Sequence, residues 1–269
     1  MRHPLPAARR LRITNGAPPT AARPLILRTM AAREHPEVLR SGRLKPGVRF
    51  APRAELDLHA AVAPLAVALH AAGAGLTLVA EPPGPFGIPD FVAVYGTRDR
   101  LDARLGLPVP PLLNRVDAGI VAALAAARPL STASVARRTG WRPDTIERRL
   151  PGLVRAGAVQ LAGSGTYVRP AALTSIGRLL ALEVKVRDWR RAVLQGRTYA
   201  SWCDTYAIVL GRLSATSGDD LVAQVRRDAA GLAVDGRWIV RPRLTQTGTT
   251  SLWGSEHLVA ALRGQHVQE

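Results

Sequence analysis

The sequence predicts a mixed α/β protein. Short apolar runs bounded by turn residues predict strands at residues 76–81, 91–96 and 179–186. Stretches in which apolar residues recur every three or four positions predict helices before, between and after these strands. With 269 residues, the chain can bury a substantial core, either as one elaborated domain or as two smaller ones.

The first elements are a helical segment and a hairpin. Residues 54–73 are rich in Ala and repeat their larger apolar residues at helical spacing, but Pro64 interrupts the pattern. This predicts either one kinked helix or a short helix followed by a second that starts near Pro64. The strands LTLVAE and FVAVYG then flank the turn-rich PPGPFGIPD, which is typical of a hairpin.

Residues 112–170 are predicted to form a unit of three helices and a hairpin. The second helix begins at Ser131, which is suited to cap it, and ends at Gly140. This order resembles the winged helix-turn-helix domain of bacterial DNA-binding proteins, whose third helix enters the major groove and whose wing touches the DNA backbone. The resemblance implies that the following residues face DNA: Arg142, Thr145, Arg148, Arg149 and Arg169. A purely architectural role in protein contacts is the alternative.

After this unit the pattern returns to alternating strands and helices. We expect a helix over Arg187–Cys203 and a strand over Tyr206–Gly211. A helix near residues 218–230, a strand from Trp238 and a final amphipathic helix over residues 256–263 complete the prediction.

Glu183 and Lys185 lie in the strand LLALEVKV. Strand alternation places both side chains on one face, among apolar neighbours. Burying a carboxylate and an ammonium is costly unless they are paired, hydrated or bound to a metal. Taken alone, the pair indicates either an ion pair at a sheet surface or a site in which Glu183 holds a divalent cation.

A wider pattern resembles the PD-(D/E)xK nuclease family. It consists of GIPD before the strand FVAVYG, then ALEVKVRDWRRAVLQGRTY. The resemblance implies a restriction-endonuclease-like mixed sheet flanked by helices, on an α-β-β-β-α-β core. It also implies that Asp90 and Glu183 bind the metal and that Lys185 orients the hydrolytic water. Gln195 and Tyr199 fit the family's Q-x-x-x-Y pattern.

The family often adds a glutamate from its opening helix. Glu55 could take that role, with Glu81 as a weaker candidate. Oxygen ligands suit Mg²⁺ or Mn²⁺, which would stabilise charge on the phosphate and lower the pKa of a bound water. Asp90 and Glu183 are far apart in the sequence, so we expect the winged-helix unit to be inserted at the turn between their strands.

Four segments follow from this interpretation. Residues 1–24 are predicted to be a basic flexible arm, residues 25–111 and 171–269 the nuclease-like core, and residues 112–170 the winged helix-turn-helix domain.

The charge of the chain indicates a polyanionic partner. There are 37 Lys and Arg against 20 Asp and Glu, a formal charge of +17, and DNA is the leading candidate. Arg190 and Arg191 are expected to help hold the DNA backbone. A bias toward Arg from a GC-rich genome would also raise this charge. No apolar run in the sequence is long enough to span a bilayer. Cys203, as the only cysteine, excludes an internal disulfide and predicts a cytoplasmic setting.

The sequence therefore predicts a DNA-binding, metal-dependent nuclease, with a place in defence or repair. The alternative is a winged-helix transcriptional regulator whose nuclease-like core has become an inactive scaffold. A homodimer and a larger defence or repair complex are both left open.

Overall fold

The computed structural model describes residues 37–40, 57–213, 215–245 and 248–264. All of them belong to one compact unit, His35–Glu269. The predicted basic arm over residues 1–24 lies outside the described residues. Among the described helices, none has both the length and the apolar character that crossing a membrane requires.

A mixed seven-stranded sheet forms the core, which confirms the predicted α/β class. Its spatial order is β1-β2-β3-β7-β8-β9-β10. Strands β2, β3 and β7 are antiparallel neighbours, whereas β7, β8 and β9 run parallel. Strand β1 is parallel to β2, and β10 is antiparallel to β9. The strands are β1 (Glu37–Arg40), β2 (Leu76–Ala80), β3 (Phe91–Tyr95), β7 (Arg178–Lys185), β8 (Thr205–Leu210), β9 (Gly231–Val234) and β10 (Arg237–Val240).

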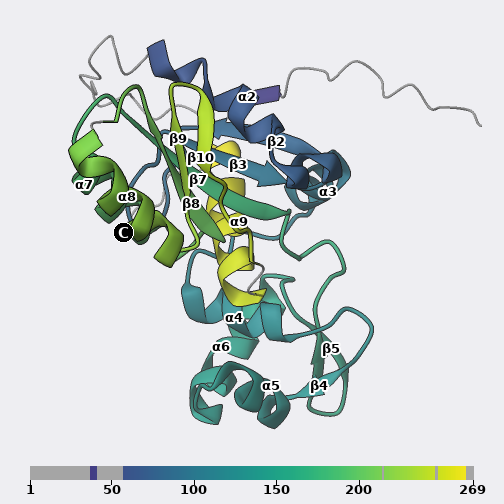
Figure 1. The fold of residues 1–269 in the computed structure, drawn as a ribbon. Coiled ribbons are helices and arrows are strands. Elements are labelled where there is room, and N and C mark those ends of the chain that lie inside the picture. The colour runs from purple at the N-terminus through teal and green to yellow at the C-terminus, as the bar shows by residue number, and fades with distance from the viewer. Residues whose placement is uncertain (1–36, 41–56, 214, 246–247, 265–269) are drawn as a thin grey trace, which may run out of the picture. The chain divides into compact units, whose positions relative to one another are not determined.

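Helices cover both faces of this sheet (Figure 1). The short helix α2 (Val62–Val67) and the 3-10 turn η1 (His70–Ala74) pack on one face. The other face is covered by α7 (Trp189–Tyr199), α8 (Ala215–Arg227) and α9 (Gly248–Leu262). Pro64 lies in the first turn of α2, where its missing amide hydrogen costs nothing, so the structure agrees with the second of the two predicted arrangements.

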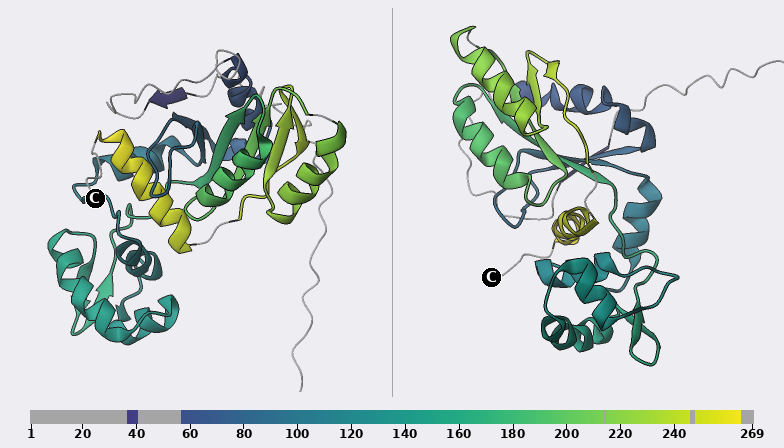
Figure 2. Two further views of the ribbon diagram at one scale, coloured as in Figure 1. Left: turned by 90° about the vertical axis from the view of Figure 1, so that its left-hand side faces the viewer. Right: turned by 60° about the horizontal axis from the view of Figure 1, so that its bottom comes forward.

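The chain between β3 and β7 forms a helical region with its own small sheet (Figure 2). Its three strands lie in the order β4-β6-β5 and are antiparallel. Ser131 caps α5 as predicted, because its hydroxyl accepts a hydrogen bond from the Ser134 amide. The elements are α3 (Arg98–Gly106), α4 (Arg115–Ala123), β4 (Leu130–Ser131), α5 (Thr132–Thr139), α6 (Pro143–Arg155), β5 (Gln160–Gly163) and β6 (Thr166–Val168).

This region leaves the large sheet and returns to it at one point. Gly96 follows β3 and Gly177 precedes β7, and their backbones touch. A Cβ on Gly96 would lie 2.2 Å from the Ile176 carbonyl oxygen, and one on Gly177 would lie 2.5 Å from that of Tyr95. Only glycine permits this approach, which brings together the two ends of the chain between β3 and β7. We refer to this part of the chain as the helical excursion.

Helix α9 joins the excursion to the sheet. It packs on α4 on one side and on β7 on the other, and the Trp253 indole donates a hydrogen bond of 2.7 Å to the Leu113 carbonyl. The helix predicted over residues 256–263 is present, but it begins earlier, at Gly248, and it is not amphipathic, because its residues 251–261 are all buried. Ser251, Ser255 and Glu256 make hydrogen bonds inside the protein, which lowers the cost of burying them.

Candidate active site

The pairing of β3 with β7 brings the two predicted metal ligands together. Phe91 pairs with Leu182 in the antiparallel ladder, so the next position on each strand is Asp90 and Glu183. An Asp90 carboxylate oxygen accepts a hydrogen bond of 2.7 Å from the Val184 amide. Residues far apart in the sequence are thus fixed side by side at the end of two central strands.

Lys185 completes the cluster. Its Nζ lies 2.8 Å from Glu183 Oε1 and 3.9 Å from Asp90 Oδ2. The ammonium also donates to the Val184 carbonyl oxygen at 3.0 Å. Strand alternation places Glu183 and Lys185 on the same face, as predicted from the sequence. We refer to Asp90, Glu183 and Lys185 as the carboxylate–lysine cluster.

Glu183 is fully buried, with an exposed fraction of 0%. Burial and the neighbouring Asp90 carboxylate raise its pKa, whereas hydrogen bonds from Lys185 and Tyr199 lower it. The Tyr199 hydroxyl donates to Glu183 Oε2 at 3.0 Å from helix α7. Helix α7 therefore supplies one of the contacts that favour the ionised form of Glu183.

Considered without their other contacts, the three groups of this cluster do not cancel in charge. Two buried carboxylates face one ammonium whose side chain is only 21% exposed. With all three groups ionised, the cluster carries a net negative charge in a place with little water. Two carboxylates and the carbonyl oxygen of Val184 are hard oxygen donors of the kind that Mg²⁺ and Mn²⁺ prefer.

The other predicted site residues are placed differently. Gln195 lies one turn before Tyr199 on α7, and its side-chain oxygen is buried without a hydrogen-bond partner among the described residues. Glu55 lies outside the described residues. Glu81 is exposed at the end of β2, and its amide donates to the Asp90 carbonyl. Within the described part of the chain, no three His, Cys, Asp or Glu side chains gather into a group that could hold a metal.

Two backbone outliers flank the cluster. Glu81 follows β2 with φ of 47°, and Asp188 follows β7 with φ of 51°. Residues other than glycine seldom adopt such left-handed conformations, which cost of order 1–3 kcal/mol and often occur at functional sites. In this chain they end β2 and begin α7, so both turns hold the edges of the site.

No protein-family model, curated protein or solved structure matches this chain. What the cluster can do therefore follows from its own residues. Two adjoining carboxylates with a neighbouring ammonium suit the capture of a divalent cation and of an anionic substrate.

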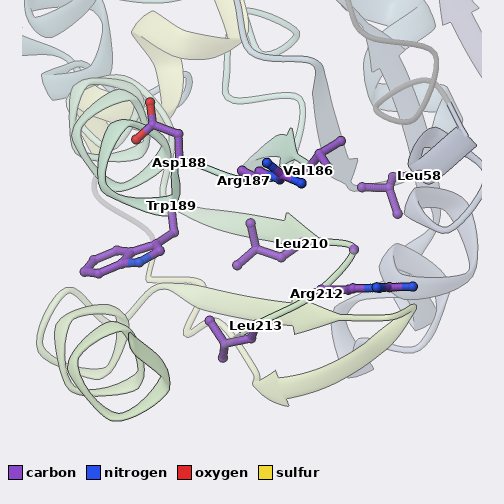
Figure 3. A pocket seen from close by; sticks show the side chains of 9 residues that line it. Leu58, Val186, Arg187, Asp188, Trp189, Leu210, Arg212 and Leu213 are labelled. Atoms are coloured by element: carbon purple, nitrogen blue, oxygen red, sulfur yellow. The ribbon is translucent and has the colours of Figure 1, made fainter. Parts of the chain in front are cut away.

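A pocket opens at the carboxyl ends of β7 and β8 (Figure 3). Its volume is about 510 Å³, and Val186, the neighbour of Lys185, forms part of its wall. Arg187 and Arg212 line it from the ends of the two strands. The sequence analysis missed these arginines, although ligands commonly bind where parallel strands end and both residues directly follow such ends.

Three of the predicted DNA-binding residues lie at the start of α6 or on its exposed face. The Arg142 side chain is 85% exposed and lies 3.3 Å from Asp144. Arg148 is also exposed, whereas Thr145 is half-buried and its amide is bound by the Asp144 carboxylate. Arg142 and Arg148 can therefore reach a phosphate without giving up a buried partner.

Arg149 and Arg169 have partners inside the protein. Arg149 makes two hydrogen bonds to the Asp117 carboxylate of α4, and this contact raises its pKa. Arg169 donates to main-chain carbonyl oxygens, including those of Leu124 at 2.8 Å and Leu173 at 2.9 Å. In the structure both guanidinium groups hold the excursion together.

Arg190 and Arg191 are exposed in the first turn of α7. The Arg190 guanidinium lies over the Trp189 ring, 4.5 Å from its centroid. Both side chains are close in sequence to the pocket and could add to its positive field.

Proposed function

We propose that this chain is a metal-dependent deoxyribonuclease of the PD-(D/E)xK type. The observation that carries this proposal is the meeting of Asp90, Glu183 and Lys185 at the end of β3 and β7. Glu183 has no exposed surface, and its pKa is raised by burial and by Asp90. A carboxylate held at this electrostatic cost is more readily explained by a ligand than by folding.

The order of elements around the cluster supports the same proposal. Without the excursion between β3 and β7 and the 3-10 turn η1, the stretch from α2 to β8 reads α2, β2, β3, β7, α7, β8. This is the helix, three strands, helix and strand of the family that the sequence resembles. Strands β2, β3 and β7 form a meander, and α7 connects β7 to the parallel strand β8.

Each residue of the cluster has a defined part in this proposal. Asp90 and Glu183 would hold the cation, with the Val184 carbonyl oxygen as a further donor. When bound, Mg²⁺ or Mn²⁺ supplies positive charge to the scissile phosphate and lowers the pKa of a coordinated water. Lys185 would hold the attacking water, or the charge that develops on the phosphate, from the partly open side of the cluster.

The helical excursion would hold the DNA. Its elements follow the order α4, β4, α5, α6, β5, β6, which is that of a winged helix-turn-helix domain with α6 as the recognition helix. Arg142 and Arg148 are exposed cations at the start and on the surface of α6, and neither is held by a buried carboxylate among the described residues. The +17 charge of the whole chain supports binding of a polyanion.

The decisive experiment compares Glu183→Gln and Lys185→Met with the wild type. Both variants should lose cleavage by at least about 10²-fold, the usual cost of removing one charged group from a reaction site. Their affinity for DNA, measured without metal, should be unchanged. Asp219→Asn, which removes an exposed carboxylate on α8, should cut like the wild type.

If the wild-type protein cuts no duplex, single-stranded or branched DNA with Mg²⁺ or Mn²⁺, the proposal that it is a nuclease is refuted. DNA binding that persists in that case would favour a regulator with an inactive nuclease-like scaffold.

A further inference from the structure

The pocket beyond Lys185 combines an apolar wall with two cations. Leu58, Val186, Leu210 and Leu213 are apolar lining residues, and Trp189 lines the pocket from the start of α7. Arg187 and Arg212 project beside them, with Leu210 between the two arginines in the view of Figure 3. The pocket thus has one part suited to a flat apolar group and another suited to an anion.

Arg187 and Arg212 are not neutralised by an ion pair within the part of the chain that the structure describes. Both side chains are exposed, and neither makes a hydrogen bond or an ion pair with any described residue. Asp188 is the one carboxylate among the lining residues, and its side chain accepts the Arg191 amide to cap α7. The positive charge at the pocket is therefore available to an external anion.

The size and the apolar wall narrow the class of ligand. About 510 Å³ lies in the range of small-molecule sites and greatly exceeds what an inorganic phosphate needs. Phosphate alone would use the arginines and leave the leucine wall in water. A nucleotide would satisfy both parts, because its base has an apolar face and its phosphate takes a pair of guanidinium groups.

We infer that this pocket holds one unpaired nucleotide of the substrate strand, with its phosphate between Arg187 and Arg212. The inference rests on the proposed nuclease function: Val186, which lines the pocket, directly follows Lys185 in the chain, so the pocket lies at the carboxyl end of the strand that carries Glu183 and Lys185. A base inside a duplex is stacked and paired, so it cannot present its face to Leu58 and Leu210. The chain should therefore favour single strands or frayed ends over intact duplex.

The test titrates the full chain with thymidine 5′-monophosphate, thymidine and inorganic phosphate in metal-free buffer. Thymidine 5′-monophosphate should bind at least about tenfold more tightly than either of its parts. Arg187→Gln and Arg212→Gln should each weaken it about tenfold. Arg128→Gln is the matched control, since it removes an exposed arginine from the helical excursion without touching the pocket.

Cleavage assays with Mn²⁺ complete the test. A labelled single strand should be cut faster than the same strand in a duplex, and the two pocket variants should raise KM for it with little change in kcat. Cleavage by wild type with both KM and nucleotide binding unchanged in the pocket variants would overturn the inference and leave the nuclease intact. Inorganic phosphate that binds as tightly as the nucleotide would also overturn it.

Failure of the nuclease proposal looks different. Wild type that cuts no DNA, while thymidine 5′-monophosphate binding still depends on Arg187 and Arg212, would refute the nuclease and retain a nucleotide site.

Discussion

The pKa of Glu183, in the candidate site, is subject to opposing influences. Burial and Asp90 favour its neutral form, whereas Lys185 and Tyr199 favour the carboxylate. Metal binding needs the carboxylate, so the two favourable contacts are part of the proposed machinery. Tyr199 is a positioning residue in this scheme, because it would act on the cation through Glu183.

Tyr199→Phe tests this role with a single hydroxyl group. Its loss removes a hydrogen bond that lowers the pKa of Glu183, so that pKa should rise. A carboxylate whose pKa is higher ionises only at higher pH, so the acid limb of the rate profile should move to higher pH. Activity well above this limb should be retained.

The control is Tyr206→Phe, which removes a hydroxyl bound to Asp228 instead. Its acid limb should match that of the wild type. An unmoved limb in Tyr199→Phe would contradict the proposed role, and a pH–rate profile for the three proteins decides between these outcomes.

Among the elements, α9 is held by a fully buried ion pair. Arg104 of α3 makes two hydrogen bonds to the Glu256 carboxylate, at 2.8 and 2.6 Å, and the Leu112 amide donates a third at 2.9 Å. Both side chains have an exposed fraction of 0%. The pair joins α3, the segment before α4 and the last helix of the chain.

Breaking this pair from one side should be costly. Arg104→Met or Glu256→Gln should each lower the free energy of unfolding by about 3–5 kcal/mol, because a buried group loses its partner. The double variant Arg104→Met with Glu256→Met should lose less than the sum of the two single changes. Urea denaturation followed by circular dichroism measures all of them.

Asp102→Asn provides the comparison, since it breaks the exposed Arg98–Asp102 pair on α3 and should cost only about 0.3–0.5 kcal/mol. Equal losses in the exposed and buried variants would show that Arg104 and Glu256 contribute no more than a surface pair.

These elements also show where sequence reasoning succeeds and where it ends. The strands over residues 76–80, 91–95 and 178–185 were predictable because each is a short apolar run with clear boundaries. The end of α9 was predicted, but its start at Gly248 and its complete burial were not, because Glu256 is buried only through a partner 152 positions away. Helix α3 reads as a polar stretch for the same reason, since the buried Arg104 looks like a surface residue.

The candidate site follows the same rule. Strand alternation and the resemblance sufficed to select Asp90, Glu183 and Lys185 before their meeting was visible. The internal partners of Arg149 and Arg169 could not be foreseen, because the sequence does not distinguish an arginine that is exposed from one that is paired in the folded chain. The pocket arginines were missed since the sequence alone did not show that β7 and β8 are parallel neighbours.

For the whole molecule, the large positive charge predicts salt-sensitive DNA binding. The logarithm of the affinity should fall linearly with the logarithm of salt concentration. Arg142→Gln and Arg148→Gln should each reduce this slope by about 1, because each exposed arginine would release about one counterion from DNA. Fluorescence anisotropy at several salt concentrations gives the slopes.

Arg149→Gln is the comparison at this scale. It removes the same charge from the same helix, but its guanidinium is engaged by Asp117, so its slope should change less and its stability more. Slopes equal to the wild type in both Arg142→Gln and Arg148→Gln would exclude α6 as the DNA-binding helix.

The contact between Gly96 and Gly177 makes the relative position of Asp90 and Glu183 independent of the chain segment that lies between the two glycines. Asp90 and Glu183 are held in register by two strands that meet at this glycine junction, and the length of the intervening chain does not enter. The segment between these glycines can therefore change without altering the pairing that brings Asp90 beside Glu183. A replacement would still need a surface for α9 and a partner for the buried Glu256.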